Sequence, residues 1–405
     1  MTDIVSLAQH ELDDINNEID SIALHNQQRV LQAFIEHRVS AMHFANTNGY
    51  GYGDIGRDTL QNIFAQIFGT ESAIVSPNIL SGTHALTIAL FGLLRPGDLL
   101  LSITGDVYDT LQTVISGADG SLEDFGVVYD KVDLINDDFD YQTIADKVIK
   151  RKPKVIYIQK SRGYSWRQAI SCDMIKLIAE HIRSIDKDVV LFVDNCYGEF
   201  VERMEPTQVG CDVCAGSLIK NLGGSLAQTG GYIVGRSKLI QRIAGRLTSP
   251  SVGAEIGSYA YGYQYLYQGL FMAPHIVAQA VKTAMLVSRC MNMLGYDALP
   301  HIDQQPRDIV CSVKLNDRDK LIKFVQTVQT VSPVDSYALP TPWNMPGYQD
   351  QVIMAAGCFV QGASIELSCD APIREPYIAY LQGGITYEHG IILANKLTEL
   401  LSHSN

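Results

Sequence analysis

Lys220 and Asp194 are the two residues whose types and positions most clearly suggest chemistry. Lys220 comes just before a glycine-rich turn, and Asp194 ends an apolar run at residues 189–193. A lysine amine removed from water loses its proton easily, becomes a nucleophile and can form a Schiff base with an aldehyde. A carboxylate can keep a pyridine nitrogen protonated, so that the ring takes up electrons. The pair is typical of pyridoxal-phosphate chemistry, although each residue alone also fits an ordinary loop or strand end.

Ser81, Gly82 and Thr83 form a third motif, which follows a predicted strand and opens a predicted helix. The start of a helix carries free N–H groups and a partial positive charge, so it binds phosphate well. Gly82 lets the backbone approach a ligand closely, and Ser81 or Thr83 can add a hydroxyl. The same residues would also make an ordinary N-cap. Their place ahead of Asp194 and Lys220 favours a phosphate site.

Composition narrows the class of protein. The chain has 405 residues, a net charge of −13, 46% hydrophobic residues and 19% charged residues, which suits a globular enzyme. The acidic balance argues against nucleic acid or an anionic membrane as a partner. We find no apolar run of about 18 residues that would predict a membrane helix. The first residues also lack a signal peptide pattern, which predicts a cytoplasmic protein.

Two other motifs are weak signals. Gly51, Gly53 and Gly56 match the dinucleotide fingerprint, but no predicted strand precedes them, as that fold requires. Cys211 and Cys214 form a C-x-x-C without a second pair or a histidine cluster, so we expect no metal site. Most of the eight cysteines lie in apolar runs, and we expect buried free thiols.

The pattern of elements predicts an α/β fold with a mostly parallel central sheet covered by helices on both faces. Strands that are mostly apolar are expected at 72–76, 98–103, 125–129, 154–158, 189–193 and 231–235, with helices at 83–94, 140–151 and 171–185. After a long helix at 273–294, a smaller α+β unit is expected from strands 308–313 and 363–367 and helices 317–329 and 387–402.

These elements suggest three parts. We expect an N-terminal helical arm at 1–45, a large cofactor-binding domain at 46–285 and a small C-terminal domain at 286–405. The arm has a narrow apolar face, a feature that often packs on a partner subunit.

Together these residues resemble the fold-type I pyridoxal-phosphate enzymes, which have the aspartate aminotransferase-like fold. Within them, the chain is similar to the Cys/Met-metabolism group of cystathionine and methionine γ-lyases, and most similar to its bacterial "aluminium resistance" or methionine γ-lyase-like branch. The likeness to that branch covers residues 49–390 and is carried by the runs 50–57, 81–85, 163–167, 193–195, 217–220 and 382–389.

The resemblance implies roles for the motif residues. Lys220 would carry pyridoxal 5'-phosphate, and Asp194 would pair with its ring nitrogen. Gly82 and Thr83, beside Ser81, would contact the phosphate, and Ser217, three residues before the lysine, would add a hydroxyl.

Three more residues have roles that only the resemblance implies. Tyr108 matches the aromatic residue that stacks on the cofactor ring, where it could protonate the leaving sulfur; the alternative is core packing. Tyr52 and Arg57 match residues that reach the phosphate of a neighbouring subunit, although Arg57 could be a surface charge of an early helix.

One run departs from the lyases. They carry an arginine for the substrate carboxylate in a Val-Arg-Leu-Ser-like strand, whereas this chain has Glu366 at that position in 365–368. A carboxylate cannot bind a carboxylate anion. Arg374 is the nearest candidate replacement, and Arg167, beside Trp166, is the second candidate unless it only lines a loop.

The resemblance implies a cytoplasmic lyase that breaks a carbon–sulfur bond in an amino acid by β- or γ-elimination. It also implies a homo-oligomer, a dimer or tetramer, with shared active sites. Three alternatives stay open: transamination, β-substitution or aldol cleavage on the same fold; a non-catalytic binding protein; and a stress-tolerance role without catalysis.

Overall fold

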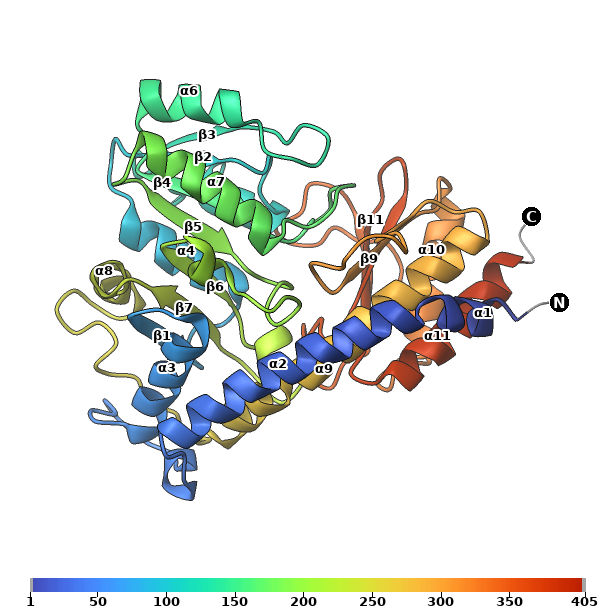
Figure 1. Ribbon diagram of the computed structural model, residues 1–405, viewed down its shortest axis with the longest axis horizontal. Coiled ribbons are helices and arrows are strands. Elements are labelled where there is room, and N and C mark those ends of the chain that lie inside the picture. Colours follow the sequence, from blue (N-terminus) through green and yellow to red (C-terminus); the bar gives the residue numbers. More distant parts are fainter. Residues whose placement is uncertain (1–2, 403–405) are drawn as a thin grey trace.

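The computed structural model describes residues 3–402 and shows two units, each built on its own sheet (Figure 1). Within these residues the larger sheet has seven strands, in the order β1-β7-β6-β5-β4-β2-β3, and the smaller has five, in the order β10-β11-β12-β9-β8. The larger sheet comprises β1 (Ser72–Ser76), β2 (Leu99–Ser102), β3 (Val128–Lys131), β4 (Val155–Gln159), β5 (Val190–Asp194), β6 (Val213–Ser217) and β7 (Gly231–Gly235). The smaller sheet comprises β8 (Ala298–Leu299), β9 (Val310–Lys314), β10 (Val352–Ala355), β11 (Ser368–Pro372) and β12 (Ile378–Gln382).

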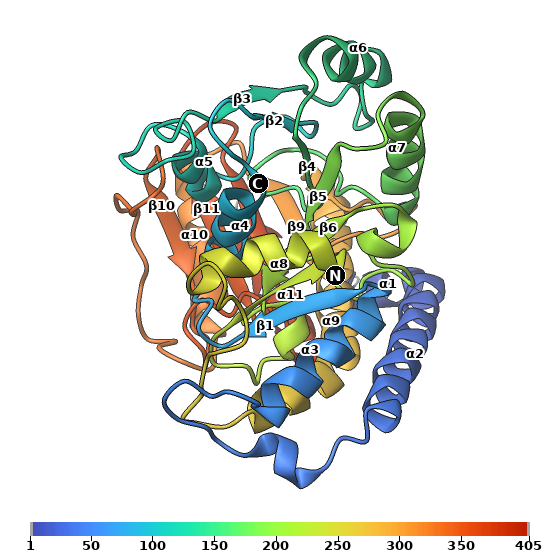
Figure 2. The same ribbon diagram turned by 90° about the vertical axis from the view of Figure 1, so that its left-hand side faces the viewer.

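The larger sheet is mostly parallel, as predicted. Strands β3, β2, β4, β5 and β6 run parallel, and β7 is antiparallel to both β6 and β1. Every residue of β4 and β5 is buried, because helices cover both faces of this sheet. One face packs against α4 (Gly82–Leu93), α5 (Asp109–Ile115) and α8 (Ser237–Leu247), and the other against α6 (Tyr141–Arg151) and α7 (Cys172–Ile185) (Figure 2).

Helix α7 shows how the sequence specifies this packing. The Ser171 hydroxyl caps its start by accepting a hydrogen bond from the Met174 N–H at 3.1 Å, which satisfies one of the free donors of the first turn. Ile175, Ile178 and Ile182 follow at helical spacing and are buried. The apolar stripe therefore faces the sheet while the polar residues face solvent.

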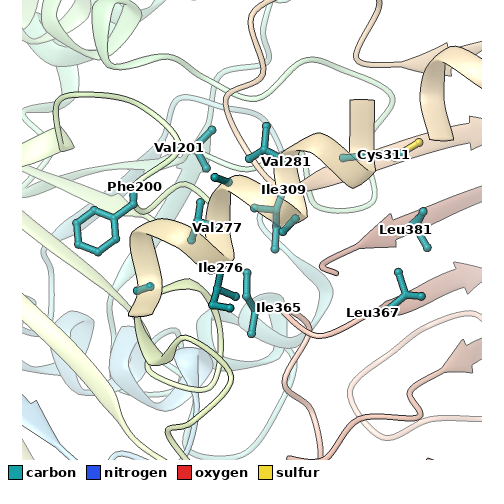
Figure 3. Close-up of a cluster of buried hydrophobic side chains, with 14 of the residues drawn as sticks. Phe200, Val201, Ile276, Val277, Val281, Ile309, Cys311, Ile365, Leu367 and Leu381 are labelled. Atoms are coloured by element: carbon teal, nitrogen blue, oxygen red, sulfur yellow. The ribbon is translucent and has the colours of Figure 1, made fainter. Parts of the chain in front are cut away.

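Helix α9 (Gln264–Met293) connects the two units. It packs against α2 (Asp13–Glu36), α11 (Tyr387–Ser402) and β9. Figure 3 shows the buried cluster on it, where Phe200 and Val277 on one side continue into Ile309, Ile365 and Leu381 on the other. Contrary to the sequence-based expectation, α9 is long and apolar enough to cross a membrane, but 72% of that stretch is buried inside the protein. We interpret it as a core helix.

The N-terminal arm is helical, as predicted. It forms α1 (Ile4–Glu11) and α2, and η1 (Ala41–Phe44) and α3 (Ile55–Phe68) follow. Its apolar face packs inside this chain, with Leu12 and Val30 fully buried. Leu24, Leu31 and Ile35 of α2 remain exposed.

The small unit differs from the prediction in one important place. The strand expected at 363–367 lies further along the chain, at β11, and residues 363–367 form turns and bends. Strands β6, β8, β10 and β12 were not predicted, whereas α10 (Arg318–Thr330) and α11 were. The proposed domain boundary at 285 stays a prediction and falls inside α9.

Candidate active site

The candidate site lies where three neighbouring parallel strands end. Gln159, Asp194 and Ser217 are the last residues of β4, β5 and β6, and Gln159 pairs with Asp194 in the sheet register. The carboxyl ends of parallel strands meet at one edge of the sheet, which is the usual ligand position in such folds. The topology therefore brings residues from distant parts of the sequence together.

A cavity of about 80 Å³ at this edge is lined by five of the predicted site residues: Lys220, Asp194, Gly82, Thr83 and Tyr108. It also includes Gln159, Cys196 and Tyr197. A cleft of about 820 Å³ adjoins it, sharing Tyr108 and Gln159.

Asp194 is buried in the cavity wall with 6% of its surface exposed. The Tyr157 hydroxyl donates to Asp194 Oδ2 at 3.1 Å, and the Cys196 N–H donates to Oδ1 at 3.1 Å. Burial raises the pKa of Asp194, while the charge of Lys220 opposes the shift. A cationic ring N–H at this carboxylate would favour its ionised form.

Lys220 follows β6 and is half-buried, with Nζ 4.1 Å from the centroid of the Tyr197 ring. Burial disfavours the charged amine, but acidic neighbours, Cys196, Tyr197 and Asp194 among them, outweigh burial and raise the pKa of Lys220. From burial alone we expected a lowered pKa for Lys220. That expectation was wrong, because acidic groups surround the amine in the cavity.

The start of α4 forms the candidate phosphate site. A Cβ on Gly82 would lie 3.0 Å from Cys196 Sγ and 3.5 Å from Ser217 Cβ, so the backbone approaches β5 and β6 closely. Ser81 Oγ accepts from the His84 N–H at 3.1 Å, so this hydroxyl acts as the N-cap. Thr83 Oγ1 lies 3.0 Å from Thr110 Oγ1. The first N–H groups of the helix have no intrahelical acceptor and are available to an anion.

An amine, a carboxylate and a helix N-terminus thus line one cavity, and this set fits pyridoxal phosphate. The amine would hold its aldehyde, the carboxylate its ring nitrogen and the helix start its phosphate. Residues 3–402 contain no group of three or more His, Cys, Asp or Glu side chains arranged to hold a metal.

Tyr108 stands between the cavity and the adjoining cleft. Its N–H donates to Gln159 Oε1 at 2.8 Å, and its hydroxyl lies 2.7 Å from the Tyr348 hydroxyl. Its ring centroid is 5.2 Å from that of Tyr164. Burial first, and then the nearby charge of Asp370, raise the pKa of Tyr108 well above the ordinary value.

Tyr52 and Arg57 do not line the cavity that holds Lys220. The Arg57 guanidinium is buried and donates to the Gly51 carbonyl at 3.0 Å, with Asp58 as its ion-pair partner. Tyr52 is 67% exposed. Their expected contact with a neighbouring subunit remains a prediction.

The candidates for the substrate carboxylate differ in their surroundings. Arg374 lines the large cleft beside Tyr108 and pairs with Asp350 at 3.0 Å. Arg167 is buried and donates to the backbone carbonyls of Gln159, Ser161 and Gln168, which supports the alternative of a loop-bracing residue.

Glu366 does not lie in a strand and does not line the cavity or the adjoining cleft. It is buried and accepts hydrogen bonds from Ser225 Oγ and from the N–H groups of Phe359 and Val360. Burial raises the pKa of this carboxyl.

Sequence reasoning did not single out several residues that the structure brings to the site. Tyr197 lies in the left-handed region at φ 71° under Lys220, an unusual conformation for a tyrosine that often marks a functional site. Its place three residues after Asp194 was the available signal. Tyr164 lies in the run 163–167 that carries the resemblance, but no role was assigned to it. Tyr348 and Asp370 had no local signal, because they come from an irregular segment and from a strand whose position was mispredicted.

The fold and the site define a class. Two sheets joined by a long helix, with the lysine and aspartate at strand ends, form the fold of the fold-type I pyridoxal-phosphate enzymes. Escherichia coli YhfS, described as pyridoxal-5'-phosphate dependent, matches with a TM-score of 0.65 and 18% identity over 94% of this chain and 96% of its own, which supports the fold alone.

The family is more specific. The chain belongs to the methionine γ-lyase family, whose model matches residues 1–402. Bacillus subtilis (strain 168) YnbB is 50% identical over 380 residues, covering 93% of this chain and 90% of YnbB. A carbon-sulfur lyase involved in aluminum resistance from Clostridium novyi NT has 48% identity and a TM-score of 0.92, covering 97% of this chain and 94% of that one. L-methionine γ-lyase from Pseudomonas putida is 27% identical over 196 residues, 48% of this chain and 45% of that enzyme.

These comparisons confirm the resemblance stated from the motifs. The chain is an enzyme of the pyridoxal-phosphate-dependent carbon–sulfur lyase class.

Proposed function

We propose that this enzyme holds pyridoxal 5'-phosphate on Lys220 and breaks a carbon–sulfur bond of a sulfur amino acid by β- or γ-elimination. The observation that carries this proposal is the single cavity lined by Lys220, Asp194 and the start of α4. The lyase descriptions of the family and of the Clostridium novyi protein support the reaction type.

When bound, the cofactor supplies an aldehyde for the substrate amine and a ring that takes up electron density from Cα. Asp194 keeps the ring nitrogen protonated from its buried position. Lys220, whose amine lines the same cavity, would take the proton from Cα as a positioned base. Tyr108, protonated over the neutral range, gives its proton to the departing sulfur.

Arg374 is our candidate for binding the substrate carboxylate. It lines the cleft that adjoins the cavity at Tyr108, and a guanidinium can hold a carboxylate through two parallel hydrogen bonds. Such a clamp would fix the rotation about the Cα–N bond, so that the Cα–H bond stands perpendicular to the ring.

Borohydride reduction tests the cofactor assignment. We expect the purified protein to absorb visible light and, after reduction and digestion, to carry the cofactor on the peptide that contains Lys220. Lys160 is a fair competitor, since it is fully buried and paired with Glu202 at 2.7 Å. A reduced adduct on Lys160 would overturn the assignment. If the adduct is found on Lys220, a screen of sulfur amino acids for release of keto acid and free thiol identifies the substrate.

We also propose a cytoplasmic homo-oligomer, a dimer or tetramer, with shared sites. The exposed rings of Tyr50, Tyr52 and Tyr261 suit a contact with a second copy, and the eight buried free thiols suit a reducing compartment. Tyr52→Ala is a sharper probe than a substitution at Arg57, whose side chain braces its own loop. Mixed Lys220→Ala and Tyr52→Ala chains should recover activity that neither shows alone, and no recovery after proven subunit exchange would count against sharing.

A further inference from the structure

Tyr348 brings a hydroxyl from the small unit to Tyr108 of the large unit. It lies in segment 331–351, between α10 and β10, and a Cβ on Gly347 would lie 3.4 Å from Thr110 Cγ2 of α5. The two hydroxyl oxygens are 2.7 Å apart, and the rings meet edge to face with centroids 6.1 Å apart. The two units therefore meet at Tyr108, which lines the cavity that holds Lys220.

The direction of this hydrogen bond decides what Tyr108 can do. Each phenol has one proton, so Tyr108 can offer its own proton to a substrate only if Tyr348 donates in the pair. The Tyr348 hydroxyl lies 2.7 Å from the Tyr108 hydroxyl, so it is in place to be that donor.

A buried carboxylate stands close to the pair. Asp370 is 8% exposed and accepts from Gln382 Nε2 at 3.1 Å. Burial first, and then the charge of Asp370 among other groups, raise the pKa of Tyr108 and of Tyr348. Both phenols therefore keep their protons at neutral pH.

We propose that Tyr348 is a positioning residue for the acid: its hydroxyl donates to the Tyr108 oxygen and leaves the Tyr108 proton directed at the departing sulfur. This rests on the lyase function proposed above. As the carbon–sulfur bond breaks, its electron pair goes to sulfur, which takes the Tyr108 proton. The electron pair of the broken O–H bond stays on the Tyr108 oxygen, where the Tyr348 hydrogen bond stabilises it. A proton from water restores Tyr108.

Tyr348→Phe removes one oxygen and keeps the ring. With S-ethyl-L-cysteine, or S-ethyl-L-homocysteine for a γ-lyase, we expect thiol release to fall roughly tenfold or more, as for a lost hydrogen bond to a charged group. Exchange of the Cα proton with deuterium from solvent should stay near the wild-type rate, since Lys220 acts before the acid. With the S-phenyl analogue the loss should shrink, because an aryl thiolate needs less protonation to leave.

Two variants control for simple structural damage. Tyr337→Phe lies in the same segment, 87% exposed, and loses a hydrogen bond to Asp335 at 3.1 Å, so it should behave as wild type. Tyr164→Phe removes another buried hydroxyl from the same group of aromatic rings but leaves the contact between Tyr348 and Tyr108 in place, and it should slow release less than Tyr348→Phe does.

The outcomes separate the two proposals. Unchanged thiol release in Tyr348→Phe, or an equal loss of release and exchange, would overturn the positioning role while wild-type cleavage still supported the lyase. If wild-type protein released no thiol from the alkyl or aryl compounds of either chain length, the lyase proposal itself would fail and this inference with it.

Discussion

The two faces of the site are built in different ways. The face from the large unit places Asp194, Ser217 and Lys220 at or just after the ends of adjacent parallel strands, buried or half-buried. The face from the small unit contributes Arg374, from the turn between β11 and β12, and Tyr348, from the irregular segment 331–351. The first face suits chemistry that every substrate shares, and the second suits recognition of one substrate, because loops vary without disturbing the sheet.

Geometry explains the difference. Neighbouring strands lie about 4.8 Å apart, so functional groups at their ends have fixed spacing once the sheet forms. The turn at Arg374 has no such constraint, and its side chain is 44% exposed. We expect substitutions on the large face to affect catalysis strongly with any substrate, and substitutions on the small face to affect it according to the substrate.

The largest effect is expected at the large face. In the proposed function the charge of Asp194 holds the ring nitrogen protonated. Asp194→Asn removes that charge, and we expect kcat to fall roughly 10²-fold or more, the loss of a buried charge-assisted pair. Tyr157→Phe removes only one of the hydrogen bonds to Asp194 and should cost roughly tenfold or less. Steady-state keto acid release at saturating substrate measures both, with cofactor absorbance as the check on binding. Near-normal turnover in Asp194→Asn would place the partner of the ring nitrogen elsewhere.

The next effect is expected at the small face. Arg374→Ala should lower kcat/KM by roughly tenfold to a hundredfold for an amino acid substrate, because a half-exposed clamp is partly screened by water. Cofactor absorbance should not change. Asp350→Asn is the matched control, since it frees Arg374 from its ion pair and should leave kcat/KM equal to wild type or above it. Normal kinetics in Arg374→Ala would show that another group holds the carboxylate and would weaken the division between the two faces.

The same contrast separates what the sequence could predict from what it could not. The site residues Lys220, Asp194, Gly82 and Thr83 were found because an apolar strand ending in an acid, and a glycine at a helix start, are local patterns with a direct physical meaning. The cavity that they share confirms that the fold brings them together. Their chemical roles remain predictions.

Apart from Arg374, the residues of the small face could not be predicted, because no local sequence pattern marks them. The run at 363–367 has the apolar alternation of a strand, but the backbone turns there, and Glu366 is used to accept hydrogen bonds from the Phe359 and Val360 N–H groups. The strand starts instead at Ser368, which puts Asp370 near the phenols. Contacts such as Tyr108 with Tyr348 join residues far apart in the chain, and no local pattern reports them.

The smallest effect concerns stability. It tests whether the buried carboxyl of Asp370, in the small unit, lowers the free energy of unfolding. Burial raises the pKa of Asp370 to about 6 from its ordinary value of 3.8. Between these values the unfolded chain releases the proton while the folded protein still holds it, so folding becomes less favourable as pH rises and the full cost is reached above about pH 6. Asp370→Asn removes this cost and can still accept from Gln382.

We therefore expect Asp370→Asn to raise the free energy of unfolding of the cofactor-free protein by on the order of 2 kcal/mol at pH 8, and by little near pH 4. Urea unfolding at the two pH values measures this difference, and Asp119→Asn, at an exposed position, should give none at either. A variant that is less stable at pH 8 would mean that the Asp370 charge is held favourably by the folded protein. Asp370 would then stabilise the folded small unit. The two faces would differ only in how their substitutions affect catalysis.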